Sequence, residues 1–227
     1  MKRPQRELLE RILHTEVRNI TPYRRNWCVE TSQMWWIAKR MRTQRLQWWC
    51  RVDRELRQRG FQAMLPVFSD EQNWILTPFI KGKSGKYSQL EDVKKMVEIL
   101  AAFHQAGREL LTPPRKEAAF LLYQRVAERL ARFYRVLEKT SRLEANLGKL
   151  LAKVGKDFYL DGLRAWEKLE RLPLKELCHE EYWRRCLTHR DLASHNWLID
   201  QDRKIWLIDF ETADYDCQVG DVWQMAS

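Results

Sequence analysis

The sequence has few of the residues that interrupt regular structure, with 8 glycines and 7 prolines among its 227 residues. Neither type gathers into a low-complexity run, and hydrophobic residues make up 44% of the chain. Disordered chains lack the apolar side chains needed to form a core, so this composition excludes an unstructured protein. We expect a chain that folds throughout and is long enough for one large domain or two lobes.

Paired cysteines and long apolar runs are missing as well. Five cysteines are scattered without a Cys-x-x-Cys pair or a zinc-finger spacing, namely Cys28, Cys50, Cys178, Cys186 and Cys217. This pattern excludes a disulfide framework and favours free thiols in a reducing compartment. No apolar run approaches the roughly 20 residues that cross a bilayer. We therefore expect a cytoplasmic protein without a membrane partner.

Positive charge and tryptophan, in contrast, are abundant. The net charge is +10 and the chain contains 11 tryptophans. Excess positive charge favours anionic partners such as nucleotides. Tryptophan beside arginine, as in Tyr182-Trp183-Arg184-Arg185, can also stack on single-stranded nucleic acid. No nucleic-acid motif accompanies these residues, and regularly spaced tryptophan usually fills a core, so nucleic acid is the less favoured partner.

Hydrophobic periodicity predicts a mixed first part and a helical second part. In the first part we expect helices at 5–16 and 43–59 and strands at 26–31, 35–41, 61–68 and 73–80. In the second part we expect helices at 89–107, 122–137, 143–154 and 159–169. The segment Lys81–Lys86, rich in lysine and glycine, is the best candidate for a linker between two lobes. A ligand site is expected in the cleft between them.

One hairpin gathers the residues that can carry chemistry. Trp197–Ile199 and Lys204–Ile208 are apolar runs around a polar turn, so Asn196 and Asp209 become neighbours at its base. An amide oxygen beside a carboxylate suits Mg²⁺. Asp191, on the loop before the hairpin, can orient a hydroxyl and accept its proton, as phosphoryl transfer requires. The alternative is that these residues only cap turns and end a strand.

The same segment carries a family resemblance. The run H-R-D-L-A-S-H-N-W-L, followed by I-W-L-I-D-F, resembles the H-x-D-x-x-x-x-N loop and the metal-binding aspartate of protein-kinase-like enzymes. The ending I-D-F-E-T-A looks like the aminoglycoside phosphotransferase and choline kinase branch. Gly220-Asp221-Val222 and the helix Leu100–His104 look most like spore-coat kinases of the CotS type. The resemblance covers about residues 20–227.

This resemblance implies an α+β fold with a small mixed β-sheet lobe and a larger, mainly helical lobe. Residues 1–80 would form the nucleotide-binding lobe, residues 81–88 the hinge and residues 89–227 the catalytic lobe. Enzymes of this branch usually continue well past the equivalent of Asp221 with helices that complete the larger lobe, so we expect the catalytic lobe to be incomplete here, with apolar surface exposed.

The resemblance also implies roles for single residues, with ATP and Mg²⁺ as cofactors. Asp191 would be the catalytic base, Asn196 and Asp209 would hold magnesium, and Asp221 would brace the catalytic loop. Lys39, on one face of a strand with Trp35, Ile37 and Met41, would contact the α- and β-phosphates and pair with Glu55. Phe79 and Ile80, in the segment Thr77–Ile80, would pack against adenine. An exposed strand lysine and a surface helix charge are the alternatives for Lys39 and Glu55.

The histidines and the first turn complete the expectations. His189 should brace the catalytic loop, His104 should be a satisfied core residue, and His195 has no second metal ligand at a useful spacing. The turn Tyr23–Cys28 contains no glycine, although loops that cradle phosphates use glycine to let backbone N–H groups approach. Arg24 and Arg25 could replace those groups by charge.

Three functions follow from these residues. The first is an ATP- and Mg²⁺-dependent phosphotransferase acting on a hydroxyl of a small molecule or of a spore-coat-type protein. The second is a catalytically weak or inactive scaffold of a spore coat, suggested by the missing glycines. The third, a nucleic-acid-binding protein, rests on charge and tryptophan alone. The acceptor cannot be identified from the sequence, because substrate choice depends on a pocket.

Overall fold

The computed structural model describes residues 2–115, 120–140 and 145–226. Its first part is an antiparallel five-stranded sheet in the order β1-β2-β3-β5-β4. The elements of this part are α1 (Arg6–Leu13), β1 (Val17–Tyr23), β2 (Asn26–Thr31), β3 (Trp35–Arg40), α2 (Thr43–Gln58), β4 (Phe68–Ser69) and β5 (Trp74–Pro78). The expected hairpin of β2 and β3 and the helix α2 are confirmed. Gly60 follows α2 with φ +87, a conformation that favours glycine and ends the helix.

Alternation along β3 gives the sheet two different faces. Trp36 and Ala38 are buried and pack with Leu9 and Ile12 of α1 in one hydrophobic cluster. Ile37 and Lys39 alternate with these residues along β3 and point to the other face, as period-two alternation requires. Helix α1 therefore closes one side of the sheet and leaves the other side for the site.

Two strand predictions in this part need correction. Strand β1 was not expected, because only Val17 and Ile20 are buried along it and its alternation is weak. The strand expected at 61–68 is wrong apart from its last residue. Pro66 has no N–H to donate, and Met64 makes only an isolated bridge to Leu207. The apolar side chains of this segment pack into the core without forming a ladder.

The second part contains the longer helices and the hairpin between Asn196 and Asp209. Its elements are β6 (Gly82–Ser84), α3 (Leu90–Ala106), α4 (Leu122–Leu137), α5 (Ala145–Glu170), α6 (Leu174–Trp183), β7 (Leu187–Thr188), η2 (Ser194–Asn196), β8 (Trp197–Asp200), β9 (Ile205–Leu207), η3 (Phe210–Thr212), β10 (Asp214–Tyr215) and α7 (Val219–Ala226). The expected α3, α4 and β8–β9 hairpin are confirmed. No helix among the described residues is long and apolar enough to span a membrane.

The segment expected to be a linker contains a strand. Strand β6 pairs with β8 and extends the hairpin to a three-stranded sheet in the order β6-β8-β9. Gly82 permits this close approach, because a Cβ atom there would lie 2.4 Å from the carbonyl oxygen of Ile199. The connection between the two parts is thus held against the β8–β9 hairpin.

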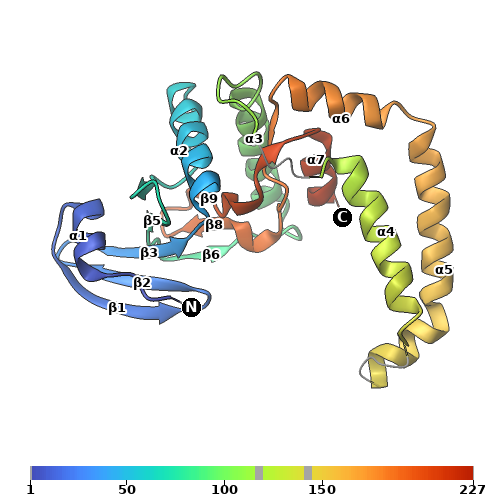
Figure 1. Cartoon of the computed structure of the whole chain (residues 1–227), viewed down its shortest axis with the longest axis horizontal. Coiled ribbons are helices and arrows are strands. Elements are labelled where there is room, and N and C mark those ends of the chain that lie inside the picture. Colours follow the sequence, from blue (N-terminus) through green and yellow to red (C-terminus); the bar gives the residue numbers. More distant parts are fainter. Residues whose placement is uncertain (1, 116–119, 141–144, 227) are drawn as a thin grey trace.

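Helices α4 and α5 pack against each other and extend away from the rest of the molecule, and α6 leads the chain back (Figure 1). The two helices expected at 143–154 and 159–169 are one helix, α5; residues 143 and 144 lie outside the described residues. Gly155 does not interrupt α5, since it packs where a Cβ atom would lie 2.3 Å from Cδ2 of Leu137. At this position glycine serves helix packing.

Candidate active site

A cavity of about 520 Å³ opens on the free face of the five-stranded sheet. Its walls come from β3, β5, α2 and the β6-β8-β9 sheet, where the two parts of the chain meet. Five of the residues expected at the site line this cavity: Lys39, Phe79, Ile80, Asn196 and Asp209. Asp191 and Glu55 are not among its lining residues.

Lys39 enters the cavity from β3 and makes two ion pairs. Its Nζ lies 2.7 Å from Oδ1 of Asp209 and 2.9 Å from Oε1 of Glu211. Ile37, two residues earlier on the same face, lines the cavity beside it. The expected emergence of a lysine from an apolar row is confirmed, and its charge is shared by two carboxylates.

Asp209 is placed by the hairpin and by the residue that follows it. The pair Trp197 and Leu207 brings the hairpin ends together, and Asp209 then adopts the left-handed region with φ 66. The next ring, Phe210, stacks on Trp49 of α2 with ring centroids 4.6 Å apart. A non-glycine residue in this backbone region is uncommon and marks a position held by its surroundings.

Asn196 faces Asp209 from the other end of the hairpin. Its backbone carbonyl accepts a hydrogen bond from the N–H of Ile208 at 3.0 Å, which closes the hairpin base. Its side-chain Nδ2 donates to the backbone carbonyl of Asp191 at 2.9 Å. Because the amide nitrogen is used in this way, the amide oxygen is the atom that remains for a ligand. Asn196 is 2% exposed, so its orientation is fixed.

Asp191 lies half-buried on the loop between β7 and η2, next to the cavity and not on its wall. Its carbonyl contact with Asn196 links the expected catalytic residue directly to the expected metal site. Tyr87, a residue that sequence reasoning missed, donates from its hydroxyl to the carbonyl of Leu192 and accepts from the Nε1–H of Trp197. Tyr87 therefore ties the residue after Asp191 to the first residue of β8.

Asp221 of α7 also holds the loop that contains Asp191. Its carboxylate accepts the backbone N–H groups of His189 at 2.7 Å and of Arg190 at 2.8 Å. It also lies 3.0 Å from Nε2 of His104. The expected contacts of Asp221 with the loop and the expected satisfied, buried state of His104 are both present. The Nε2 atom of His189 lies 3.0 Å from the carbonyl oxygen of Ile208, and burial lowers the pKa of this imidazole.

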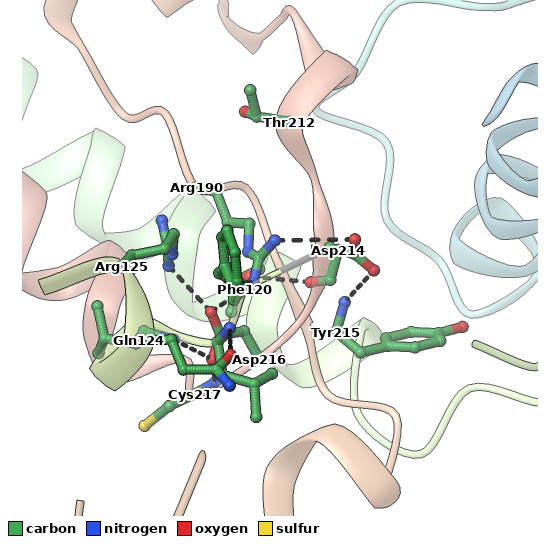
Figure 2. A network of polar contacts seen from close by, with 12 residues as sticks. Phe120, Gln124, Arg125, Arg190, Thr212, Asp214, Tyr215, Asp216 and Cys217 are labelled. Atoms are coloured by element: carbon green, nitrogen blue, oxygen red, sulfur yellow. Dashed lines mark hydrogen bonds and ion pairs between the residues drawn. The ribbon is translucent and has the colours of Figure 1, made fainter. Parts of the chain in front are cut away.

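A network of arginines around the buried Asp214 and Asp216 anchors the loop at Arg190 (Figure 2). Arg190 adopts φ 69, and its guanidinium reaches Oδ2 of Asp216 at 2.7 Å. Arg125 of α4 reaches the same oxygen at 2.9 Å. Asp214 accepts from the guanidinium of Arg115. The helical arm that begins with α4 is thereby linked to the residue beside Asp191.

The expected pair of Lys39 and Glu55 is wrong. The carboxylate of Glu55 accepts from Arg59 at 2.8 Å and from the backbone N–H and the hydroxyl of Thr112, both at 3.1 Å. It fixes the segment after α3 to α2 and does not line the cavity. On α2 it is instead Asp53, one turn after Trp49, that lines the cavity.

Asp53 and Glu211 are the carboxylates that sequence reasoning missed. The spacing of Trp49 and Asp53 places both on one face of α2, but the sequence does not show that this face borders the cavity. Asp53 binds Arg57 through two contacts of 3.0 Å, and burial raises the pKa of its carboxyl group. Glu211 stands two residues after Asp209 in the I-D-F-E run and could have been included on that ground.

The donor atoms at this site fit a magnesium ion. A carboxylate from Asp209 and an amide oxygen from Asn196 are hard oxygen ligands of the kind that Mg²⁺ prefers. The carboxylates of Asp209 and Glu211 already hold a cation, the ammonium group of Lys39. No cluster of three or more histidine, cysteine or acidic ligands occurs among the described residues.

The two parts and the cavity at their junction define a kinase-like α+β protein. The chain belongs to the phosphotransferase enzyme family, whose model matches residues 23–227. No curated protein sequence matched the chain.

Solved structures share the fold. An aminoglycoside phosphotransferase from Alicyclobacillus acidocaldarius has a TM-score of 0.72 at 17% identity, covering 92% of this chain and 67% of its own. A spectinomycin phosphotransferase in complex with ADP and spectinomycin has a TM-score of 0.68 at 14% identity, covering 96% and 74%. The choline kinase LicA from Streptococcus pneumoniae has a TM-score of 0.55 at 14% identity, covering 97% and 75%. At these identities the likeness concerns the fold alone.

Proposed function

We propose that this chain transfers the γ-phosphoryl group of ATP to a hydroxyl group of a small molecule, with Mg²⁺ as cofactor. The observation that carries the proposal is the convergence of Lys39, Asn196 and Asp209 in one cavity beside Asp191. These residues come from positions far apart in the chain, and their types match the parts that phosphoryl transfer uses.

Each residue of the site has a separate role in the proposed transfer. Asp191 accepts the proton of the acceptor hydroxyl while the new oxygen–phosphorus bond forms and the bond to the β-phosphate oxygen breaks. Lys39 contacts the phosphates from β3, and Phe79 and Ile80 pack against the adenine. Asn196 and Asp209 hold Mg²⁺, which supplies charge neutralisation for the phosphate oxygens.

The class of acceptor draws support from the neighbours. Among them are a spectinomycin phosphotransferase and a choline kinase, both named for small-molecule acceptors. The sequence resemblance to CotS-type kinases adds a hydroxyl of a spore-coat protein as a second class of acceptor. It also supplies the competing function, a spore-coat scaffold without turnover.

Turnover by the full chain tests the proposal. We expect ADP to be released slowly from ATP in the presence of Mg²⁺. If spectinomycin or choline is added and serves as the acceptor, the rate of ADP release should rise. Asp191→Asn should reduce the rate by roughly 10²- to 10⁴-fold, because it removes the proton acceptor and keeps the shape of the side chain. Asp202→Asn, in the exposed turn of the same hairpin, is the matched control and should keep the wild-type rate. Equal rates for Asp191→Asn and the control would exclude Asp191 from this role, and ATP binding without any turnover would favour the scaffold.

A further inference from the structure

The turn between β1 and β2 overhangs the cavity. Tyr23 pairs with Asn26, so the turn consists of two residues, Arg24 and Arg25. Tyr23, Arg24 and Asn26 line the cavity, whereas Arg25 is not among its lining residues. Of these two adjacent arginines, Arg24 therefore borders the cavity and Arg25 does not.

Arg24 is held in an uncommon conformation. Its φ is 53, in the left-handed region that glycine or asparagine would adopt more easily. Its guanidinium carbon lies 5.7 Å from the ring centroid of Tyr23. That ring packs edge-on against Phe79 with centroids 5.7 Å apart. The turn is therefore fixed to the segment that is expected to pack against adenine, and the side chain of Arg24 starts from a defined position.

Arg24 differs from Lys39 in having no acidic partner among the described residues, so its charge is available to a ligand. Lys39 already shares its charge with Asp209 and Glu211. Across residues 2–115, 120–140 and 145–226, no carboxylate lies within ion-pair distance of Arg24. A guanidinium presents paired N–H donors that match two oxygens of a phosphate group, and it does so from a side chain, without a close approach of the backbone.

We propose that Arg24 binds the phosphate oxygens of the nucleotide, in place of the backbone N–H groups that a glycine-rich turn would supply. This inference rests on the proposed function, since it assigns a residue to the nucleotide of the same site. It accounts for the missing glycine, because the guanidinium of Arg24 supplies the N–H donors that the backbone of a glycine-rich turn would otherwise supply.

Binding of two ligands to the full-length chain tests the assignment. Titration calorimetry with Mg²⁺ and either ATP or adenosine separates contacts to the phosphates from contacts to the base and sugar. Arg24→Gln should weaken ATP binding by about 10-fold or more, as expected for a lost charged hydrogen bond, and should leave adenosine binding unchanged. Arg25→Gln, on the adjacent residue outside the cavity, should change neither.

A second variant guards against misfolding. Arg24→Gly removes the guanidinium and suits φ 53, so it should fold at least as well as the wild type and still lose ATP affinity. Equal ATP affinity for the wild type, Arg24→Gln and Arg24→Gly would overturn the inference and leave the proposed function standing. Equal losses for ATP and adenosine would also overturn it. A wild-type chain that binds no ATP would overturn the proposed function and the inference together.

Discussion

The two sides of the cavity are held in different ways. On the side of the proposed catalytic residue, Asp191 sits in a loop fixed by buried contacts to Asp221 and Asp216, which are 1% and 0% exposed. On the nucleotide side, the turn with Arg24 is exposed and depends on strand register and an aromatic contact. Buried polar contacts are costly to break, whereas exposed ones contribute little. The loop at Asp191 is thus held by buried polar contacts, whereas the turn at Arg24 is held by strand pairing and one aromatic contact at the surface.

The first test of this contrast is the substitution for which we expect the largest loss of stability, at Asp221. Asp221→Ala removes the acceptor of two buried backbone N–H groups, and each unsatisfied group costs about 1–3 kcal/mol. We expect the free energy of unfolding to fall by about 3 kcal/mol or more, as measured by urea denaturation. Asp202→Ala, in an exposed turn, is the control and should change it by less than about 0.5 kcal/mol. If both substitutions had the same small effect, the loop at Asp191 would not be held by buried contacts.

A smaller loss of stability is expected at Arg190. This residue combines a buried ion pair with φ 69, so two substitutions can separate the contribution of the side chain from that of the backbone. Arg190→Ala should lower the free energy of unfolding by about 2 kcal/mol through the lost contact with Asp216. Arg190→Gly should be about 1 kcal/mol less harmful, since glycine adopts this backbone conformation without strain. Thermal unfolding of the two variants side by side is the measurement. A glycine variant less stable than the alanine variant would show that the backbone at this position carries no strain.

The same contrast explains what the sequence could predict. The β8–β9 hairpin was predictable because its signals are local: two apolar runs, a polar turn, and chemistry-bearing residues at both ends. The positions of Asn196 and Asp209 follow from that pairing alone. Long, periodic helices such as α3 and α4 were predictable for the same reason.

The contacts that could not be predicted join residues distant in the sequence. Lys39 meets Asp209 and Glu211, not Glu55, because the tertiary fold sets which face of α2 borders the cavity. A helix pattern gives the relative direction of Asp53 and Glu55 but not which of them faces β3. Strand β6 was missed because its pairing with β8 depends on a glycine's closeness to a distant backbone and not on any local alternation.

The central claim is that Asp209 and Asn196 form a metal site that holds the phosphates of a nucleotide, and thermal unfolding with ATP tests it most directly. Ligand at about 100 times its dissociation constant should stabilise the native chain by about 2.7 kcal/mol, and only when Mg²⁺ is present. Asp209→Ala should abolish this stabilisation, while Asp191→Asn should keep most of it. Stabilisation by ATP that is equal in EDTA and in Mg²⁺, or that survives Asp209→Ala, would contradict the claim.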